Sequence, residues 1–152
     1  RREVSRRTRD LAASEQRYRL LADHVQDVIW TLDLRTQRFT YVSPSIRNLR
    51  GLSPEEAMAE PLGSSLTPES RARVREVMKL IGTPEEQDPF TGIYDQVCQD
   101  GTVKHVEITT TLVREGGVPV QVVGVSRDAT ARILKLFGIT DAAQIASKPA
   151  TK

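Results

Sequence analysis

Hydrophobic and polar residues alternate most clearly in the second half of the chain, at 103–113. β-branched residues are frequent there, and every second position is apolar or threonine, so one face of a strand can be buried. That face consists of Val106, Ile108, Thr110 and Leu112. Gly116 and Gly117 tolerate positive φ, so the chain can reverse before a second β-rich run at 118–125. The pattern predicts a long antiparallel hairpin, which needs further strands and a helical cover to be stable.

Three more strands are predicted before the hairpin. Runs at 27–33 and 39–43 are rich in β-branched and aromatic residues and flank a polar turn. A third run at 90–99 carries Ile93 on its expected inner face and leads into the hairpin through an Asp-Gly turn. On the first two strands, the large side chains expected to point inward are Trp30, Leu32 and Tyr41.

The segment between these strands follows a helical period. A short helix is predicted from 46 to its end at Gly51, and helix-start sequences with Pro and Glu after Ser or Thr occur at 53–56, 67–70 and 83–86. The helix that begins at Pro68 is expected to be the longest of the body, with a basic outer face. Its apolar stripe is Val74, Val77, Met78 and Ile81. Strands at both ends and helices between them predict an α+β fold, an antiparallel sheet with helices on one face.

The body of the fold, 25–130, is flanked by two further segments. Residues 1–24 contain no Pro or Gly and predict a leading helix with a partial heptad of apolar positions, Val4, Leu11, Tyr18, Leu21 and Val25. This helix can pack on its own domain, or it can pair with a second copy in a homodimer. The tail, 131–152, predicts a short helix and a frayed end. Its residues 136–143 echo 49–56, either because a second module starts there or by chance.

Charge is distributed unevenly along the chain. Residues 1–19 hold seven arginines against three acidic residues, a net +4, whereas the whole chain carries +2, so the remainder is at −2 and offers no basic platform for nucleic acid. The basic start can be a solvated helix face, or it can meet phosphates or a membrane surface. No apolar run approaches the roughly 20 residues that span a bilayer. The single cysteine, Cys98, favours a reducing compartment, so we expect a cytoplasmic location. The first residue is Arg1, which suggests a piece of a longer protein that can be membrane-anchored elsewhere.

Five short motifs, in order, resemble the PAS domain family of bacterial sensor modules across about residues 15–132. The first joins 18–22 to the strand at 27–33, and the others are 39–45, 51–56, 100–103 and 124–130. The last is similar to the family's closing Asp-Ile-Thr motif, with Ala129 in place of Ile.

The resemblance implies a five-stranded antiparallel sheet curved around a small cavity that helices close. It further implies that the flanking helices relay signals to a covalently linked output domain, such as a histidine kinase or a cyclic-di-nucleotide enzyme. Asp128 and Thr130 would then anchor the junction between the last strand and the outgoing helix. From the residues alone, both also suit a helix cap.

The residues expected to line such a cavity are mostly large and apolar: Trp30, Leu32, Tyr41, Val74, Val77, Met78, Ile93, Ile108 and Thr110. They can enclose a small, mostly apolar or aromatic ligand with one or two polar contacts. They can equally fill the core and leave no space for a ligand.

The cofactor remains unknown, although the sequence argues against two of those found in the family. Haem by the usual ligand is not expected, because the helix from Pro68 to Ile81 has no His, and His105 should point to the outer face of the sheet. A covalent flavin adduct is not expected either, because the Gly-x-Asn-Cys-Arg motif is missing and Cys98 sits on a strand. Flavin held without a covalent bond stays open. The distant His24, His105 and Cys98 have no metal-ligand spacing.

The chain is interpreted as a sensory module and not as an enzyme. A rival from another class is a small cone-shaped isomerase that uses Asp33 and Tyr41 in its cavity. A hydrolytic set of Ser43, His105 and Asp33 rests on composition alone. Among binding modules, the alternative is a dimerisation spacer without a ligand.

Overall fold

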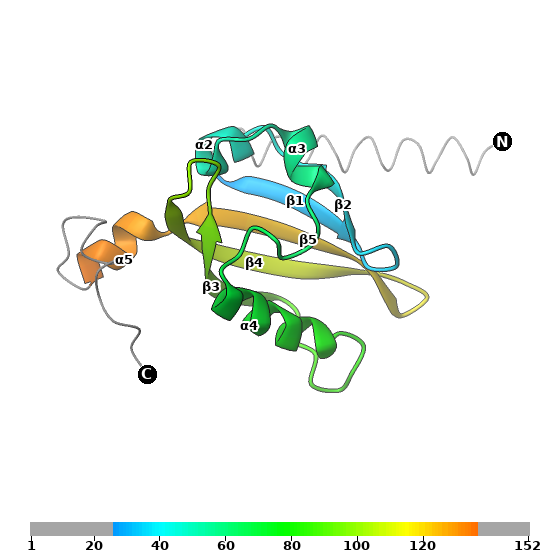
Figure 1. Ribbon diagram of the computed structural model, residues 1–152. Helices are drawn as coiled ribbons and strands as arrows, with labels where there is room; N and C mark the ends of the chain where they lie inside the picture. The colour runs from blue at the N-terminus through cyan, green and yellow to red at the C-terminus, as the bar shows by residue number, and fades with distance from the viewer. Residues whose placement is uncertain (1–25, 137–152) are drawn as a thin grey trace.

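Five antiparallel strands form a single sheet in the computed structural model, which describes residues 26–136 (Figure 1). The strands are β1 (Val28–Asp33), β2 (Arg38–Val42), β3 (Phe90–Val97), β4 (Val103–Glu115) and β5 (Val118–Asp128). Their order across the sheet is β2-β1-β5-β4-β3, so the first strand pairs directly with the last. The predicted α+β fold with a five-stranded antiparallel sheet is confirmed.

Three helices between β2 and β3 cover one face of the sheet (Figure 1). They are α2 (Ile46–Arg50), α3 (Pro54–Ala59) and α4 (Pro68–Lys79). Helix α2 ends at Gly51 with φ of 85°, a left-handed conformation that glycine adopts without a steric penalty. Helix α3 begins with the predicted capping box, in which Ser53 and Glu56 bond to each other's backbone N–H groups. Helix α4 is the longest described helix, as the sequence predicts.

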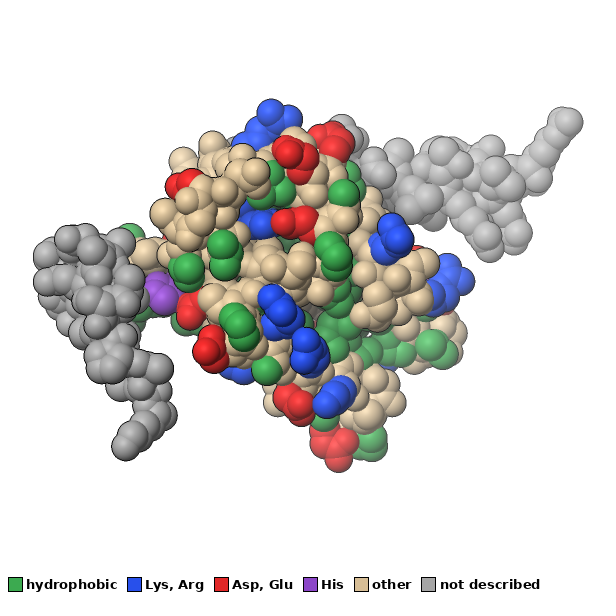
Figure 2. Space-filling model, in the orientation of Figure 1, with side chains coloured by type: hydrophobic (Ala, Val, Ile, Leu, Met, Phe, Trp, Pro, Cys, Tyr) green, Lys and Arg blue, Asp and Glu red, His purple; other side chains and the backbone are tan. Residues whose placement is uncertain are grey.

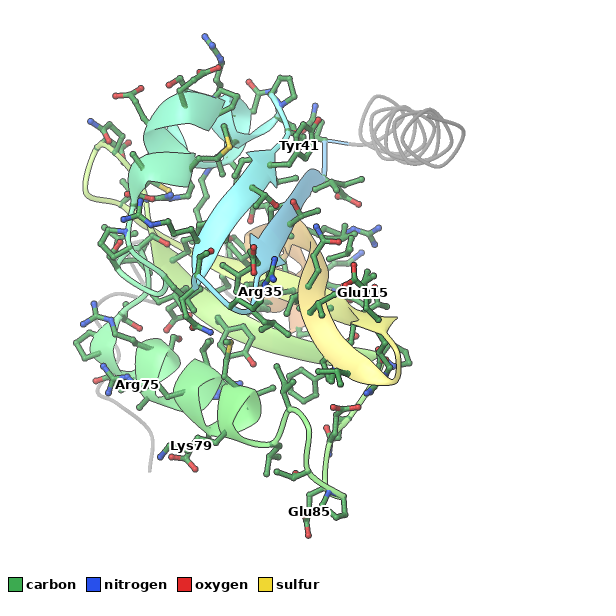
Figure 3. All side chains as sticks on the ribbon, turned by 90° about the vertical axis from the view of Figure 1, so that its right-hand side faces the viewer. Arg35, Tyr41, Arg75, Lys79, Glu85 and Glu115 are labelled. Atoms are coloured by element: carbon green, nitrogen blue, oxygen red, sulfur yellow. The ribbon has the colours of Figure 1, made fainter. Side chains whose placement is uncertain are left out.

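The basic residues of α4 lie mostly on its exposed side, although Arg73 also donates to the Ile93 carbonyl of β3 at 2.7 Å. Arg73, Arg75 and Lys79 are exposed on this helix, and Figure 2 shows basic side chains gathered there. Arg75 and Lys79 point outward in Figure 3. The apolar stripe is therefore left to face the sheet, which makes α4 one wall of an internal space.

The β4–β5 hairpin contributes residues to the inner face of the sheet. Gly116 and Gly117 form its turn with φ of 58° and 81°, as their sequence predicts. Val106 is completely buried on β4. Beyond β5, helix α5 (Thr130–Leu136) leaves the sheet.

The helix start predicted at Thr83 is wrong. Residues 80–89 contain turns but no helix. The Thr83 hydroxyl donates to the Leu80 carbonyl at 2.6 Å and so closes the end of α4 instead of capping a new helix. Glu86 accepts from the Gly82 N–H at 2.7 Å and pairs with Arg114 of β4. These contacts tie the segment to its neighbours and compete with helix formation.

The leading helix and most of the tail lie outside the described residues. This applies to all five predicted heptad positions, and also to His24 and 137–152. The boundaries at 24 and 130 and the dimer helix therefore stay predictions. Within residues 26–136, no helix is both long and apolar enough to cross a membrane.

Candidate functional site

A cavity of about 160 Å³ lies between the inner face of the sheet and the helical cover. All five strands contribute to its wall, as do α2, α3, α4 and the segments on either side of α4. Seven of the nine residues expected to line it do so: Trp30, Leu32, Val74, Val77, Met78, Ile108 and Thr110. The other two, Tyr41 and Ile93, do not.

Tyr41 lies outside the cavity because the β1–β2 pairing is interrupted. Thr31 opposes Tyr41, but the next residue, Leu32, opposes Phe39, so β2 has one extra residue at this point. Phe39 and Val42 consequently both line the cavity, although uninterrupted alternation would separate them. Tyr41 falls on the other face, at the end of the sheet remote from α4 (Figure 3).

Ile93 lies on the outer face of β3 and is 37% exposed. Strand β3 has large residues on both faces, and its pairing with β4 decides which face points inward. Tyr94, opposite the buried Val106, is 4% exposed and lines the cavity with Phe90. Burial raises the pKa of Tyr94 above its usual 10.0, while the nearby charge of Arg73 acts in the opposite direction. The sequence of β3 alone was compatible with either set of alternate residues pointing inward.

Trp30 dominates the apolar part of the cavity. Its ring meets Phe39 edge to face, with ring centroids 5.6 Å apart. Its indole N–H donates to the Ser126 hydroxyl at 2.9 Å, which holds the ring across β5. Gly124 lies beneath that ring, where no side chain would fit.

Another part of the cavity wall is polar. Arg50, from the end of α2, has a side chain that is only 6% exposed. Its guanidinium donates twice to the Glu60 carboxylate, at 2.6 and 3.0 Å, and its Nε donates to the Val97 carbonyl at 3.2 Å. Both charged residues line the cavity. The pair joins α2, the residue after α3 and strand β3, and it brings two opposite charges to one wall.

Gln96 extends this polar wall. Its side-chain N–H donates to the Ser65 hydroxyl at 3.0 Å, and both residues line the cavity. The Gln96 Oε1 is buried and finds no hydrogen-bond partner within residues 26–136. A buried acceptor without a partner costs about 1–3 kcal/mol, so this atom lowers the stability of the fold.

The sequence predictions missed these polar residues. Arg50 follows Ile46 by four positions and Leu49 by one, so it falls on the buried face of α2, and this spacing could have identified it. Gln96 shares the inner face of β3 with Phe90 and Tyr94, but it was overlooked because Ile93 was placed there.

The size of the cavity limits what it can hold. An engineered apolar cavity of about 150 Å³ binds benzene, whereas pockets for drug-sized ligands span about 300–1,000 Å³. A cavity of about 160 Å³ suits a single ring or a short chain. Helix α4 offers no His as an axial ligand for haem.

The alternative catalytic sets are not assembled. The Ser43 hydroxyl accepts from the Ile29 N–H at 2.9 Å, His105 pairs with Asp95 on the outer face of the sheet, and Asp33 accepts from the Arg35 N–H in a turn. Asp33 and Tyr41, the residues considered for an isomerase, do not line the cavity.

Neither Cys98 nor a metal cluster provides a second site. Cys98 is buried, and its thiol lies 3.4 Å from the Leu49 carbonyl oxygen, as expected for a packed small side chain. No group of three or more metal-ligating side chains occurs in the part of the chain that the structure describes.

Asp128 and Thr130 connect β5 to helix α5. The Asp128 carboxylate accepts from the Thr130 N–H at 2.9 Å, and the Thr130 hydroxyl accepts from the His105 N–H at 3.0 Å. The His105 carbonyl in turn accepts from the Ala129 N–H at 2.8 Å. The start of α5 is thus bonded to β4, and both predicted junction residues take part.

Lys104 links this junction to the cavity wall. Its ammonium donates to the Leu49 carbonyl at 2.7 Å and the Asn48 carbonyl at 3.3 Å, and it lies 3.9 Å from the Asp128 carboxylate. Leu49 and Arg50 both line the cavity. One side chain therefore contacts α2 beside the cavity and the residue that caps α5.

A family model described as PAS fold matches residues 16–129. Among solved structures, the PAS domain of a protein from Colwellia psychrerythraea is 25% identical, with a TM-score of 0.64, and the match covers 77% of this chain and 98% of that one. A sensory box histidine kinase/response regulator from Burkholderia thailandensis is 21% identical, with a TM-score of 0.63 and coverage of 86% and 94%. The N-terminal domain of a diguanylate cyclase with a PAS/PAC sensor from Marinobacter aquaeolei is 19% identical, with a TM-score of 0.60 and coverage of 70% and 98%. No curated protein matches the chain.

Proposed function

The chain belongs to the PAS fold family, and we propose that it is the sensory module of a signalling protein, which binds a small molecule in its cavity and relays occupancy through α5. The output domain is a histidine kinase or a cyclic-di-nucleotide enzyme, as in the similar histidine kinase/response regulator and diguanylate cyclase. The protein acts in the cytoplasm as a homodimer, with the leading helix as part of the dimer contact. The module itself performs no catalysis.

The cavity supports the sensory part of this proposal. It combines an aromatic pair, Trp30 and Phe39, with a polar wall around Arg50 and Gln96. Such a mixture suits a ligand with an apolar body and few polar groups.

The contacts of Lys104 are the observation that supports a relay from the cavity to α5. An occupant that displaces α2 also displaces the carbonyls that Lys104 holds at 2.7 and 3.3 Å. Because the same ammonium lies 3.9 Å from Asp128, its movement changes the cap of α5. A ligand shifts an equilibrium only through such contacts that differ between two states.

Native mass spectrometry of the freshly purified chain, compared with its denatured mass, tests the proposal. We expect a non-covalent mass excess of a small molecule on the native protein. Ala57 is buried on the cavity wall, so Ala57→Leu should fill the space and remove the excess. Ala59→Leu is the matched control, because Ala59 is exposed on the same helix.

A mass excess in wild type and Ala59→Leu, but not in Ala57→Leu, supports a sensor whose ligand occupies this cavity. An excess that survives Ala57→Leu contradicts the proposed site. A dimer that carries no excess in any variant, even after incubation with a cell extract, favours the ligand-free spacer.

A further inference from the structure

We propose that the ligand is a small apolar carboxylate, whose head group takes the place of Glu60 on the guanidinium of Arg50. This inference rests on the proposed sensory function and specifies the chemistry of its ligand. It goes beyond the PAS fold, because it depends on one ion pair in the cavity wall of this chain.

Arg50 is a fixed cation in the cavity wall. Its side chain is only 6% exposed, and its Nε donates to the Val97 carbonyl at 3.2 Å, which holds the guanidinium in place. The other two nitrogens donate to the two carboxylate oxygens of Glu60, at 2.6 and 3.0 Å. This two-pronged geometry fits any carboxylate, because the carboxylate group is planar. A buried guanidinium also has to keep an anionic partner, since its charge is costly when unpaired.

Glu60 is the member of the pair that can leave. Its side chain is 32% exposed, and the residue is the C-cap of the short helix α3. Within residues 26–136, the Glu60 carboxylate has no hydrogen-bond partner other than Arg50. When this side chain turns toward solvent, water can hydrate its charge. Arg50 is therefore fixed, whereas Glu60 is an exchangeable counter-ion.

This asymmetry selects an anionic ligand. Arg50 and Glu60 are the only charged residues among the described residues that line the cavity. A carboxylate that replaces Glu60 keeps the guanidinium paired and leaves the net charge of the wall unchanged. A cationic ligand would have to draw Glu60 away and leave Arg50 buried without a partner. A neutral ligand gains no charge-assisted hydrogen bond from the pair.

The apolar cavity fixes the size of the ligand body. The head group would occupy space that the Glu60 carboxylate vacates, so the cavity of about 160 Å³ remains for the body. Trp30 and Phe39 line it with aromatic surface, and a cavity of about 150 Å³ holds benzene. Benzoate has this body and this head group. Benzyl alcohol keeps the ring and the size but has no charge.

Titration of the full 152-residue chain with benzoate and with benzyl alcohol, followed by NMR of the single Trp30 indole N–H, tests the inference. In the wild-type protein, benzoate should bind at least about threefold more tightly than benzyl alcohol, although it competes with Glu60. Glu60→Ala removes the competitor, so benzoate should bind about tenfold more tightly still, whereas benzyl alcohol should change little. Benzoate should also raise the thermal midpoint of Glu60→Ala more than that of the wild type, because it restores a partner to Arg50.

Two further variants separate the ion pair from other causes. Glu76→Ala is the matched control, because it breaks an exposed pair with Lys79 and should leave the ratio of benzoate to benzyl alcohol affinity unchanged. The double substitution Arg50→Leu and Glu60→Leu removes both charges, so it leaves no buried charge unpaired. It should still bind benzyl alcohol but lose the preference for benzoate. Thermal unfolding of each variant establishes that it folds.

Three outcomes would overturn the inference. If benzoate binds the wild type no more tightly than benzyl alcohol, Glu60 is not exchanged and the pair is structural. If the preference for benzoate survives the double substitution, another group holds the carboxylate. If neither probe binds any variant, the ligand is of another class. In each case, a mass excess on the native protein that Ala57→Leu removes would still support the sensory function, and the lack of any excess would remove that function as well.

Discussion

Gly124 illustrates how much one residue contributes to the cavity. A Cβ built at this position would lie 2.1 Å from two ring atoms of Trp30, a distance that real Cβ atoms essentially never show. The Trp30 ring can therefore lie across β5 and reach Ser126 only because residue 124 has no side chain. The sequence contained the glycine, but only the pairing of β1 with β5 shows that it lies opposite Trp30.

Gly124→Ala should lower the free energy of unfolding by about 1–3 kcal/mol, because the Trp30 ring has to move to admit the methyl group. Urea unfolding measures this change. In a Trp30→Val background the same substitution should cost little, since the clash is gone. An equal loss of unfolding free energy in the wild-type and Trp30→Val backgrounds would contradict the close approach of the Trp30 ring to Gly124.

Removal of Glu60 should lower the free energy of unfolding more than removal of the acidic residue of an exposed ion pair. Glu60→Ala leaves the Arg50 charge, 6% exposed, without its carboxylate, whereas Glu60 itself is 32% exposed and partly screened. We expect a loss of about 1–3 kcal/mol in urea unfolding. The control is Glu76→Ala, which breaks an exposed pair with Lys79 and should cost less than about 0.5 kcal/mol. Similar costs for the two variants would show that the Arg50 pair is structurally unimportant.

Individual elements could largely be predicted from the sequence, because their signals are local. Alternation and turn glycines located the strands, and the Ser53 capping box located α3. The signal at Thr83 was equally local but failed, because Glu86 is used by Arg114, far along the chain. The orientation of Tyr41 failed because an irregularity in strand pairing is not visible in one strand alone.

The capping box of α3 gives a pH-dependent prediction. The backbone N–H and then the hydroxyl of Ser53 hold the pKa of Glu56 below its usual 4.5, since both bond to or stabilise the ionised carboxylate. A lowered pKa in the folded state means that the stabilisation is fully present above pH 4.5 and is lost as the pH falls through the lowered value. Ser53→Ala removes the hydroxyl, so the pKa of Glu56 should rise part of the way toward 4.5 in an NMR titration.

The neighbouring Glu55 provides the control for this titration, because it is also in the first turn of α3 and exposed. Glu55→Gln should leave the pKa of Glu56 nearly unaltered. A Glu56 pKa that does not change in Ser53→Ala would show that the hydroxyl contributes nothing to the cap.

At the scale of the whole molecule, the family resemblance implied a cavity, but the residues alone could not decide whether one exists. The apolar residues of 27–33, 68–81 and 103–113 suit a filled core as well as a hollow one, and only packing decides between them. The polar wall is a further product of assembly, because Arg50, Glu60 and Gln96 come from three different parts of the fold. The path from the cavity to α5 through Lys104 likewise depends on long-range contacts.

The most direct test of the central claim is amide hydrogen exchange with and without saturating toluene, a probe small enough for the cavity. If occupancy reaches the junction, exchange should change in the cavity walls and also at 130–136. Ala57→Leu, with the cavity filled, should show neither change, and Lys104→Met should bind toluene yet lose the change at 130–136. Protection confined to the cavity walls of the wild-type protein would contradict the relay.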